Sequence, residues 1–398
     1  MEDTATLQNT TPSLLKKREV YKTDLSEQIK IATELRDNSS SAENKRLLRF
    51  LSLPDLTRKP ESPIFRLADM ITSLPEFKNF DIVETPEVVH TNITFDLFNF
   101  PQEHPARSGS DTYYINKERV LRTHTTIMWY YYFTLPEIRE KLQKQGALGA
   151  LSYGKVYRKD EIDRFHNAVF HQIDGVYICD GRQKKIGKDD LVSVLIKIAK
   201  SVFGESIQWR ENVEHYPYTN PSVDIELKFG ERWLEVLGGG VIHPDVLRNL
   251  HIDPTVYSGW AFGFGLERLA MIKHAIPDIR IFWSTDERIT KQLADPQAQY
   301  HEVSKYPAIV RDISFVVDKK MDLNNYYGNV RDLGGETIEE VRLLDTYESD
   351  EKFGLDKKSY TFRITYRSLE KTLTDAFVNS VHQKICEFTA RELLATVR

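Results

Sequence analysis

The chain has 398 residues, of which 40% are hydrophobic and 28% charged, and it includes 20 Phe and 19 Tyr. At roughly 150 residues per domain, this length predicts two or three domains, and the composition excludes global disorder, collagen and a coiled coil. The net charge of -5 excludes a bulk attraction to nucleic acid, so any polyanion has to be bound by a local patch.

Two cysteines, Cys179 and Cys386, are too few for a disulfide framework or a four-thiolate zinc site. No run of residues is long and apolar enough for a membrane span. Acidic residues at positions 2 and 3 stand where a presequence would be basic. These features predict a cytoplasmic protein without a membrane partner; the alternative is the mitochondrial matrix, if a presequence has been removed.

The first 53 residues alternate between polar stretches and short amphipathic pieces. This pattern predicts a helical, loosely attached N-terminal extension. Its apolar positions include Leu25, Ile29, Ile31 and Leu35.

Two local signals follow the extension. Ser62 and Pro63 precede apolar residues at helical spacing, which predicts a helix with Ser62 as its N-cap. The run 80–89 has strand character but is interrupted by Pro86, which favours a strand at an edge or an interface.

The chain divides near residue 302. Residues 54–302 show alternating strand patterns and short helices without a regular strand-helix-strand repeat, which predicts an α+β domain with a mostly antiparallel sheet and flanking helices. Residues 303–398 predict a compact ferredoxin-like module. Its expected elements are a strand at 312–318, a helix at 324–333, strands at 338–347 and 360–366, and a long helix at 377–397.

A hairpin with an unusual polar face lies near the centre of the chain. Two strand-like runs, beginning at residues 155 and 170, are joined by a polar connection over 161–169. Alternation places Arg158 and Asp160 on one face of the first strand. It places Phe170, Gln172 and Asp174 on one face of the second. An exposed, salt-bridged sheet face is one interpretation; the other is a hairpin that grips a phosphate through Arg158 and an amine through Gln172 and Asp174.

A glycine-interrupted strand runs into an apolar helix at 258–272. Alternation puts Ala261, Gly263 and Gly265 on a smooth face, with the intervening aromatic residues in the core. Arg268 falls in the first helical turn, where the helix dipole disfavours a cation by about 0.3 to 1 kcal/mol unless an anion lies nearby. Either a bound phosphate or a surface salt bridge would account for an arginine at this position. No strand-helix-strand unit surrounds the Gly-x-Gly, so a dinucleotide-binding fold is excluded.

These segments resemble the class II aminoacyl-tRNA synthetases. Residues 157–160 with 170–172 resemble motif 2, and 263–268 resemble motif 3. Residues 306–315 resemble the start of the ferredoxin-like anticodon-binding domain of the phenylalanyl-tRNA synthetases, and both parts on one chain are the layout of their single-chain, mitochondrial-type form. The other segments that resemble this family are 104–107, 121–126, 233–238 and 259–263.

The resemblance implies ligation of L-phenylalanine to tRNA(Phe) through a phenylalanyl-adenylate, with ATP and Mg²⁺. It implies that Arg158 contacts the α-phosphate and Arg268 the γ-phosphate as catalytic residues. The resemblance does not identify the metal ligands, and Glu235 is the candidate for one of them. The resemblance implies substrate binding by His124, Thr125, Thr126, His166, Phe170, His171, Gln172, Asp174, Tyr216, Tyr218, Glu235, Ala261, Phe262 and Gly263.

The chain departs from the family pattern at several of these positions. Thr126 stands where the family usually has Ser, and Asp174 where it has Glu. Tyr216 and Tyr218 replace two Phe, so two hydroxyls border the expected amino-acid pocket, and Asn220 replaces a Glu that could hold magnesium. A synthetase for another aromatic amino acid and an inactive paralogue acting as a binding module are therefore the alternatives. The single-chain layout implies a monomer, whereas the strand around Pro86 resembles the dimer-forming motif 1 of the class, so a dimer is the alternative.

Overall fold

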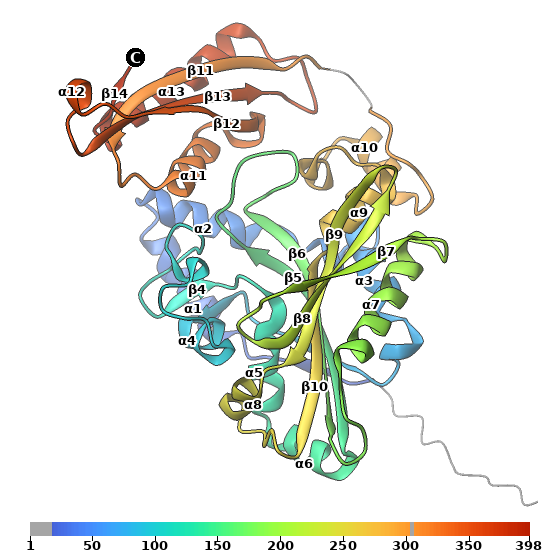
Figure 1. Ribbon diagram of the computed structural model, residues 1–398. Helices are drawn as coiled ribbons and strands as arrows, with labels where there is room; N and C mark the ends of the chain where they lie inside the picture. The colour runs from blue at the N-terminus through green and yellow to red at the C-terminus, as the bar shows by residue number, and fades with distance from the viewer. Residues whose placement is uncertain (1–17, 303–305) are drawn as a thin grey trace, which may run out of the picture.

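The computed structural model describes residues 18–302 and 306–398. A large sheet of eight strands carries the first domain, and a sheet of four strands carries the second, at one end of the first (Figure 1). The large sheet runs in the order β1 (Val20–Lys22), β2 (Asp81–Glu84), β5 (Ala147–Tyr157), β6 (Val169–Asp180), β10 (Tyr257–Gly265), β9 (Arg232–Ile242), β8 (Thr219–Phe229) and β7 (Trp209–Glu214).

Only β1, β2 and β5 pair in parallel; the pairs from β5 to β7 are antiparallel. The predicted α+β class with a mostly antiparallel sheet is thus confirmed. Helices cover both faces (Figure 1). One side has α3 (Pro63–Thr72), α7 (Lys188–Phe203) and α9 (Leu266–His274), and the other has α4 (Thr91–Thr94), α5 (Met128–Phe133), α6 (Pro136–Gln145) and α8 (Pro244–Asn249); α10 (Glu287–Ala294) follows α9.

The β10 strand divides its side chains as its alternation predicts. Trp260, Phe262 and Phe264 lie in the core beneath α3, α7 and α9 and stack along the strand, with ring centroids 6.0 and 5.5 Å apart. Ala261 belongs to the core on the opposite face. The small residues of this opposite face leave room there for the cavities described below.

The helix expected after Ser62 is present, and Ser62 Oγ accepts a hydrogen bond from the Ile64 amide at 3.2 Å. The expectation for Pro86 is wrong in part. The chain forms two strands around it: β2 lies inside the large sheet, between β1 and β5, and β3 (Val88–His90) pairs with β4 (Arg119–Leu121) in a small separate sheet. Because proline has no amide hydrogen to donate, it stands where the chain leaves one sheet for the other.

The N-terminal helices α1 (Ser26–Asp37) and α2 (Ala42–Ser52) pack against the catalytic domain. For residues 18–53 the expected loose attachment is therefore wrong. The apolar stripes of the two helices are buried against Tyr113 and Tyr157, and each fully buried side chain of this kind stabilises by about 1.5 to 3 kcal/mol. The buried residues of the stripes are Ile31, Leu35, Leu47 and Phe50.

The C-terminal domain has the expected ferredoxin-like order, with strands in the sequence β12-β13-β11-β14. The expectation of one long helix to residue 397 is wrong: α13 ends at Glu392, the backbone turns at Leu394 with φ of 49°, and β14 pairs with β11. The elements are β11 (Ile309–Asp318), α11 (Leu323–Gly334), β12 (Ile338–Tyr347), α12 (Asp350–Phe353), β13 (Lys357–Tyr366), α13 (Asp375–Glu392) and β14 (Thr396–Val397).

The loop between β5 and β6 connects the two domains. Ile162 in this loop is buried among the core residues of the C-terminal domain, and its carbonyl accepts a hydrogen bond from the Val341 amide at 3.0 Å. Arg164 forms an ion pair with the buried Glu339 at 3.0 Å. Within the two described stretches, no helix is both long and apolar enough to cross a membrane.

Candidate active site

Arg158 lies one residue beyond the end of β5. Its amide still bonds the Ala168 carbonyl at 3.1 Å, and its Nε donates to the Thr123 carbonyl at 2.9 Å. The guanidinium carbon lies 5.4 Å from the centre of the Phe170 ring. The expectation that Arg158 and Asp160 share a strand face is wrong, because the ladder ends at this pair and Asp160 already belongs to the loop. Arg158 is nevertheless held in place from two sides.

Arg268 occupies the first turn of α9, as its position in the sequence predicts. Its side chain is exposed, and Nη1 donates to the Glu235 carbonyl at 3.1 Å. Together with Arg158 it lines a cavity of about 300 Å³, the Arg268 cavity. His166, Phe170, Glu235 and Glu267 also line it. A hydrogen bond to the Asp163 carboxylate, 2.9 Å from Nδ1, raises the pKa of His166. Two cations, Arg158 and Arg268, therefore face this cavity. His166 also faces it, and its raised pKa favours the positively charged imidazolium.

A buried carboxylate lies farther along the same face of β6 and β10, beyond Gln172. Asp174 is 2% exposed and accepts hydrogen bonds from the hydroxyls of Thr125 and Thr126, the latter at 2.5 Å. Burial outweighs these donors and raises the pKa of Asp174 to about 6. On the neighbouring strand, a Cβ at Gly263 would lie 2.5 Å from Asp174 Oδ1, so only glycine leaves the carboxylate its place.

Gln172 lies one strand period from Asp174, and its Oε1 is buried without a hydrogen-bond partner among the described residues. An unpaired buried acceptor of this kind costs about 1 to 3 kcal/mol unless a ligand satisfies it. Asp174 and Gln172 together offer a carboxylate and a free carbonyl oxygen, which are the acceptors that a primary ammonium group needs.

His124 is neutral in this site. Its Nε2 lies 3.2 Å from the Thr94 carbonyl, which makes Nε2 the donor and leaves Nδ1, buried without a partner among the described residues, as an acceptor. Burial, together with the charge of Arg158, lowers the pKa of His124 to about 3. The ring meets Phe98 edge to face, at 5.5 Å between centroids.

Two tyrosines from the segment between β7 and β8 border a pocket beside β9 and β10. The rings of Tyr216 and Tyr218 stack with centroids 5.6 Å apart, and the Tyr216 hydroxyl donates to Asp224 at 2.6 Å. Burial raises the pKa of Asp224 to about 6. These tyrosines and the strand residues Ala261, Phe262 and Gly263 line a pocket of about 160 Å³, the Ala261 pocket.

A third cavity of about 550 Å³, the His124 cavity, adjoins the other two. All three are lined by Arg158, Gln172, Tyr216 and Gly263, so they form one continuous cleft. Of the residues singled out from the sequence, all but Thr125 and His171 line this cleft.

Thr125 and His171 lie behind the cleft. Thr125 reaches it only through Asp174. His171 is fully buried; its Nδ1 lies 2.6 Å from Glu267 Oε1, and its Nε2 accepts from the Leu56 amide at 3.0 Å. Sequence reasoning missed Asp224 and Glu267. For Asp224 a signal existed, since a lone acid between Val223 and Ile225 alternates onto the face opposite the core.

Among the described residues, no group of three or more His, Cys, Asp or Glu side chains is arranged to hold a metal ion. Four carboxylates line the Arg268 cavity, those of Asp160, Asp224, Glu235 and Glu267; Glu267 is bound to His171, and Asp224 and Glu235 lie on the neighbouring strands β8 and β9. Glu235 is exposed, whereas Asp224 is buried.

A mostly antiparallel sheet with one arginine just beyond the end of β5 and another in the first turn of α9, joined to a ferredoxin-like domain, defines a class II synthetase architecture. Two family descriptions agree with it: "tRNA synthetases class II core domain (F)" matches residues 53–293, and "Ferredoxin-fold anticodon binding domain" matches residues 304–398.

Curated relatives give the particular family. The chloroplastic/mitochondrial phenylalanine–tRNA ligase of Arabidopsis thaliana is 37% identical over 333 residues, which cover 81% of this chain and 73% of that protein. The mitochondrial phenylalanine–tRNA ligase of Mus musculus is 35% identical, covering 79% of this chain and 74% of its own. The phenylalanine–tRNA ligase alpha subunit of Caldicellulosiruptor bescii is 38% identical over 54% of this chain and 63% of its own. The chain belongs to the phenylalanine–tRNA ligase family.

Proposed function

We propose that this protein ligates L-phenylalanine to tRNA(Phe), first forming phenylalanyl-adenylate from ATP and then transferring the amino acid to the tRNA. The observation that carries the proposal is the polarity of the cleft. The Asp174 carboxylate and the unpaired Oε1 of Gln172 lie at the amino-acid end, Arg268 lies in the Arg268 cavity at the other end, and Arg158 lines both. A zwitterionic amino acid and a polyphosphate fit these two ends at once.

The amino-acid end orients phenylalanine. Asp174 and the Oε1 of Gln172 accept from its ammonium group, while the Ala261 pocket, walled by Tyr216 and Tyr218, takes the ring. The carboxylate then points toward Arg158, which lines the same pocket. Orientation of this kind can supply a large part of the lowering of the barrier.

The phosphate end stabilises the transition state. A carboxylate oxygen of phenylalanine attacks the α-phosphorus of ATP, the bond to the bridging oxygen of the β-phosphate breaks, and pyrophosphate leaves. The attacking carboxylate is already ionised at neutral pH, so no general base is needed. Arg158 lies where charge builds up on the α-phosphate, and Arg268 pairs with the leaving pyrophosphate.

Magnesium fits this site. Mg²⁺ is usually bound by one or two carboxylates together with substrate phosphates and water, so a cage of three protein ligands is not required. Asp224 and Glu235 are carboxylates that line the Arg268 cavity, and we propose them as its ligands. When bound, the ion neutralises phosphate charge and polarises the phosphoryl oxygens.

The C-terminal domain supplies the tRNA contact in this proposal, and the protein acts as a monomer. The organellar names of two relatives favour the mitochondrial matrix over the cytoplasm. Imaging of the tagged full-length gene product tests the compartment.

The test of the function is phenylalanine-dependent ATP–pyrophosphate exchange, compared with tyrosine, tryptophan and the remaining amino acids, followed by charging of tRNA(Phe). We expect exchange with phenylalanine at the highest kcat/KM and transfer to tRNA(Phe). A higher kcat/KM with another aromatic amino acid would reassign the substrate, and no exchange with any would make the protein an inactive paralogue.

A further inference from the structure

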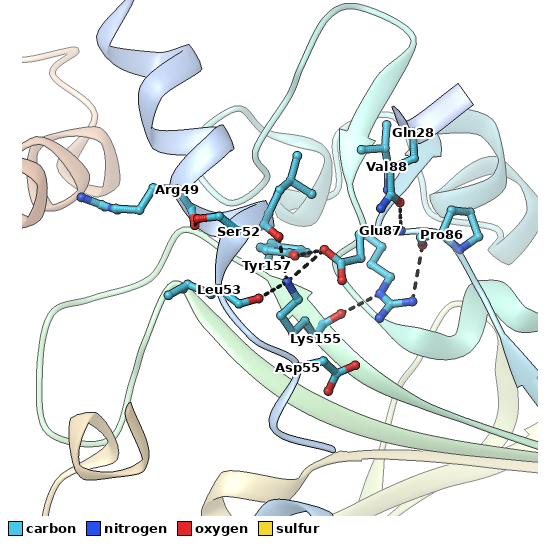
Figure 2. A network of polar contacts seen from close by, with 12 residues as sticks. Gln28, Arg49, Ser52, Leu53, Asp55, Pro86, Glu87, Val88, Lys155 and Tyr157 are labelled. Atoms are coloured by element: carbon cyan, nitrogen blue, oxygen red, sulfur yellow. Dashed lines mark hydrogen bonds and ion pairs between the residues drawn. The ribbon is translucent and has the colours of Figure 1, made fainter. Parts of the chain in front are cut away.

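A buried network of hydrogen bonds joins the N-terminal helices to β5 (Figure 2). Lys155 lies at its centre, with its side chain 3% exposed. Its ammonium donates to the carbonyls of Leu51 and Leu53, at 3.2 and 2.6 Å, and lies 3.2 Å from Glu87 Oε2. All three of its hydrogens therefore have acceptors, which is what a buried ammonium group requires. Two of the three come from the end of α2.

Glu87 is the second junction of the network. Its carboxylate also accepts a hydrogen bond from the Tyr157 hydroxyl. Its amide donates to Gln28 Oε1 at 2.6 Å, and the Val88 amide donates to the same oxygen at 3.2 Å. Gln28 belongs to α1, so both N-terminal helices contribute acceptors (Figure 2). Both helices precede the class II core match, which begins at residue 53.

Arg122 connects the network to the catalytic arginine. Its Nε donates to the Lys155 carbonyl at 2.6 Å, and its own carbonyl accepts from the Tyr157 amide at 3.0 Å. The next carbonyl, that of Thr123, is the one that holds Arg158 Nε. The backbone approaches closely here, because a Cβ at Gly154 would lie 2.7 Å from Arg122 Nη2. The placement of residues 122–123 against residues 155–158 thus sets where the Arg158 guanidinium lies.

We propose that Lys155 is a positioning residue for Arg158, and that the helix pair α1–α2 is the anchor from which it acts. This inference rests on the proposed function. Among the described residues the Arg158 side chain has one hydrogen bond, to the Thr123 carbonyl, so this carbonyl must be in the right place before substrate arrives. Loss of the Lys155 ammonium leaves Glu87 without its cation and the carbonyls of Leu51 and Leu53 without this donor, and it loosens the end of β5. A small displacement of a charged group costs an enzyme heavily in rate.

The experiment compares Lys155→Met and Lys155→Arg with the wild type in phenylalanine-dependent exchange on the full chain. For Lys155→Met we expect kcat to fall by about tenfold to a hundredfold, with KM for phenylalanine within about twofold of the wild type. Lys155→Arg, which keeps the charge and the donors, should recover most of kcat.

Lys141→Met is the matched control. Lys141 also ties the N-terminal segment to a buried carboxylate, because its ammonium lies 2.7 Å from Glu19 and 2.6 Å from Asp81. It belongs to α6, and these contacts lead away from Arg158. We expect a comparable loss of thermal stability with kcat unchanged. An equal loss of kcat in this control would mean that destabilisation alone explains the effect, and the inference would be wrong.

A double-mutant cycle separates positioning from folding. In an Arg158→Ala background, Lys155→Met should lower kcat by less than about twofold, because the residue it positions is gone. Additive effects would overturn the inference.

If Lys155→Met does not fold, Glu87→Gln replaces it in the same cycle. We then expect a smaller loss of kcat and the same non-additivity. If the wild type catalyses exchange and the Lys155 or Glu87 variants have normal kcat, this inference alone is wrong. If the wild type catalyses no exchange, the proposed function is wrong.

Discussion

The hydroxyl of Thr126 donates a 2.5 Å hydrogen bond to Oδ1 of Asp174, which thereby stays ionisable inside the protein although it is 2% exposed. Thr125 donates to the other oxygen. Each Thr hydroxyl thus replaces part of the water that Asp174 lost on folding, and the remaining cost is visible in the raised pKa of its carboxyl group.

Asp174→Asn should stabilise the protein while destroying activity. The pKa of Asp174 in the folded protein, about 6, lies above the ordinary value of 3.8. For a carboxyl group raised in this way, stability is fully present below the ordinary pKa and is lost as the pH rises through the folded value. At pH 7 the ionised group therefore costs about 3 kcal/mol, which the amide avoids. Calorimetry should show a higher Tm, and exchange should fall by about a hundredfold or more. A lower Tm would contradict this account.

Binding of phenylalanine should weaken in acid. Since burial raises the pKa of Asp174 to about 6, its anionic form is lost as the pH falls through that value. At saturating ATP, kcat/KM for phenylalanine should drop by about tenfold per pH unit below 6. His124, with a pKa lowered to about 3, stays neutral across this range. His166, which gains charge in acid, faces the Arg268 cavity, and saturation with ATP separates its effect. A flat profile would mean that Asp174 does not pair with the ammonium group.

Arg158→Ala and Arg268→Ala should each remove about 2.7 to 4 kcal/mol of transition-state stabilisation, the range for a lost electrostatic donor. Exchange kinetics with phenylalanine give this number directly. Arg248→Ala, whose partner is the exposed Asp245, is the control for loss of a surface arginine. Near-normal rates in both cleft variants would exclude a two-arginine mechanism.

Ala261→Gly should widen the substrate range. Ala261 lines the pocket of about 160 Å³ and is 3% exposed, so loss of its methyl group enlarges the space beyond the ring. The ratio of kcat/KM for p-chlorophenylalanine to that for phenylalanine should rise in the variant. An unchanged ratio would move the limit of the pocket to Tyr216 and Tyr218.

Three lysines on the C-terminal domain should contribute to tRNA binding. Lys352, Lys357 and Lys358 have side chains without an ion pair among the described contacts, whereas Arg363 and Arg367 are already paired with Asp312 and Glu339. Replacing the three lysines with Ala should raise KM for tRNA and reduce its dependence on salt, with exchange unchanged. Lys144→Ala, on α6 of the large domain, is the control. Unaltered charging at all salt concentrations would place the tRNA contact elsewhere.

The parts that the sequence predicts well are those that depend on local periodicity. The aromatic face of β10, the Ser62 cap and the ferredoxin-like order all follow from alternation or spacing within one segment. Alternation cannot say where a ladder ends, and for this reason Asp160 was expected on a strand and lies in a loop.

The errors concern contacts between distant segments. The stripes of α1 and α2 are visible in the sequence, but the surface that buries them is assembled from residues such as Tyr113 and Tyr157, far along the chain. Likewise, alternation on β6 sends His171 away from Gln172, and only the fold reveals that its partners are Glu267 and Leu56. Such partners depend on tertiary packing, which no local pattern encodes.

The burial of Ile162 in the core of the C-terminal domain limits how freely the two domains can be recombined. A chimaera that carries the anticodon-binding domain of a relative would need a recipient pocket for this isoleucine, a donor like the Val341 amide and an acid like Glu339. Without them, the loop that follows Arg158 would lose its support, and a graft intended to change the tRNA would slow the activation of the amino acid. The boundary between these domains is therefore clear in the sequence, but in the folded protein the two domains share a buried core contact.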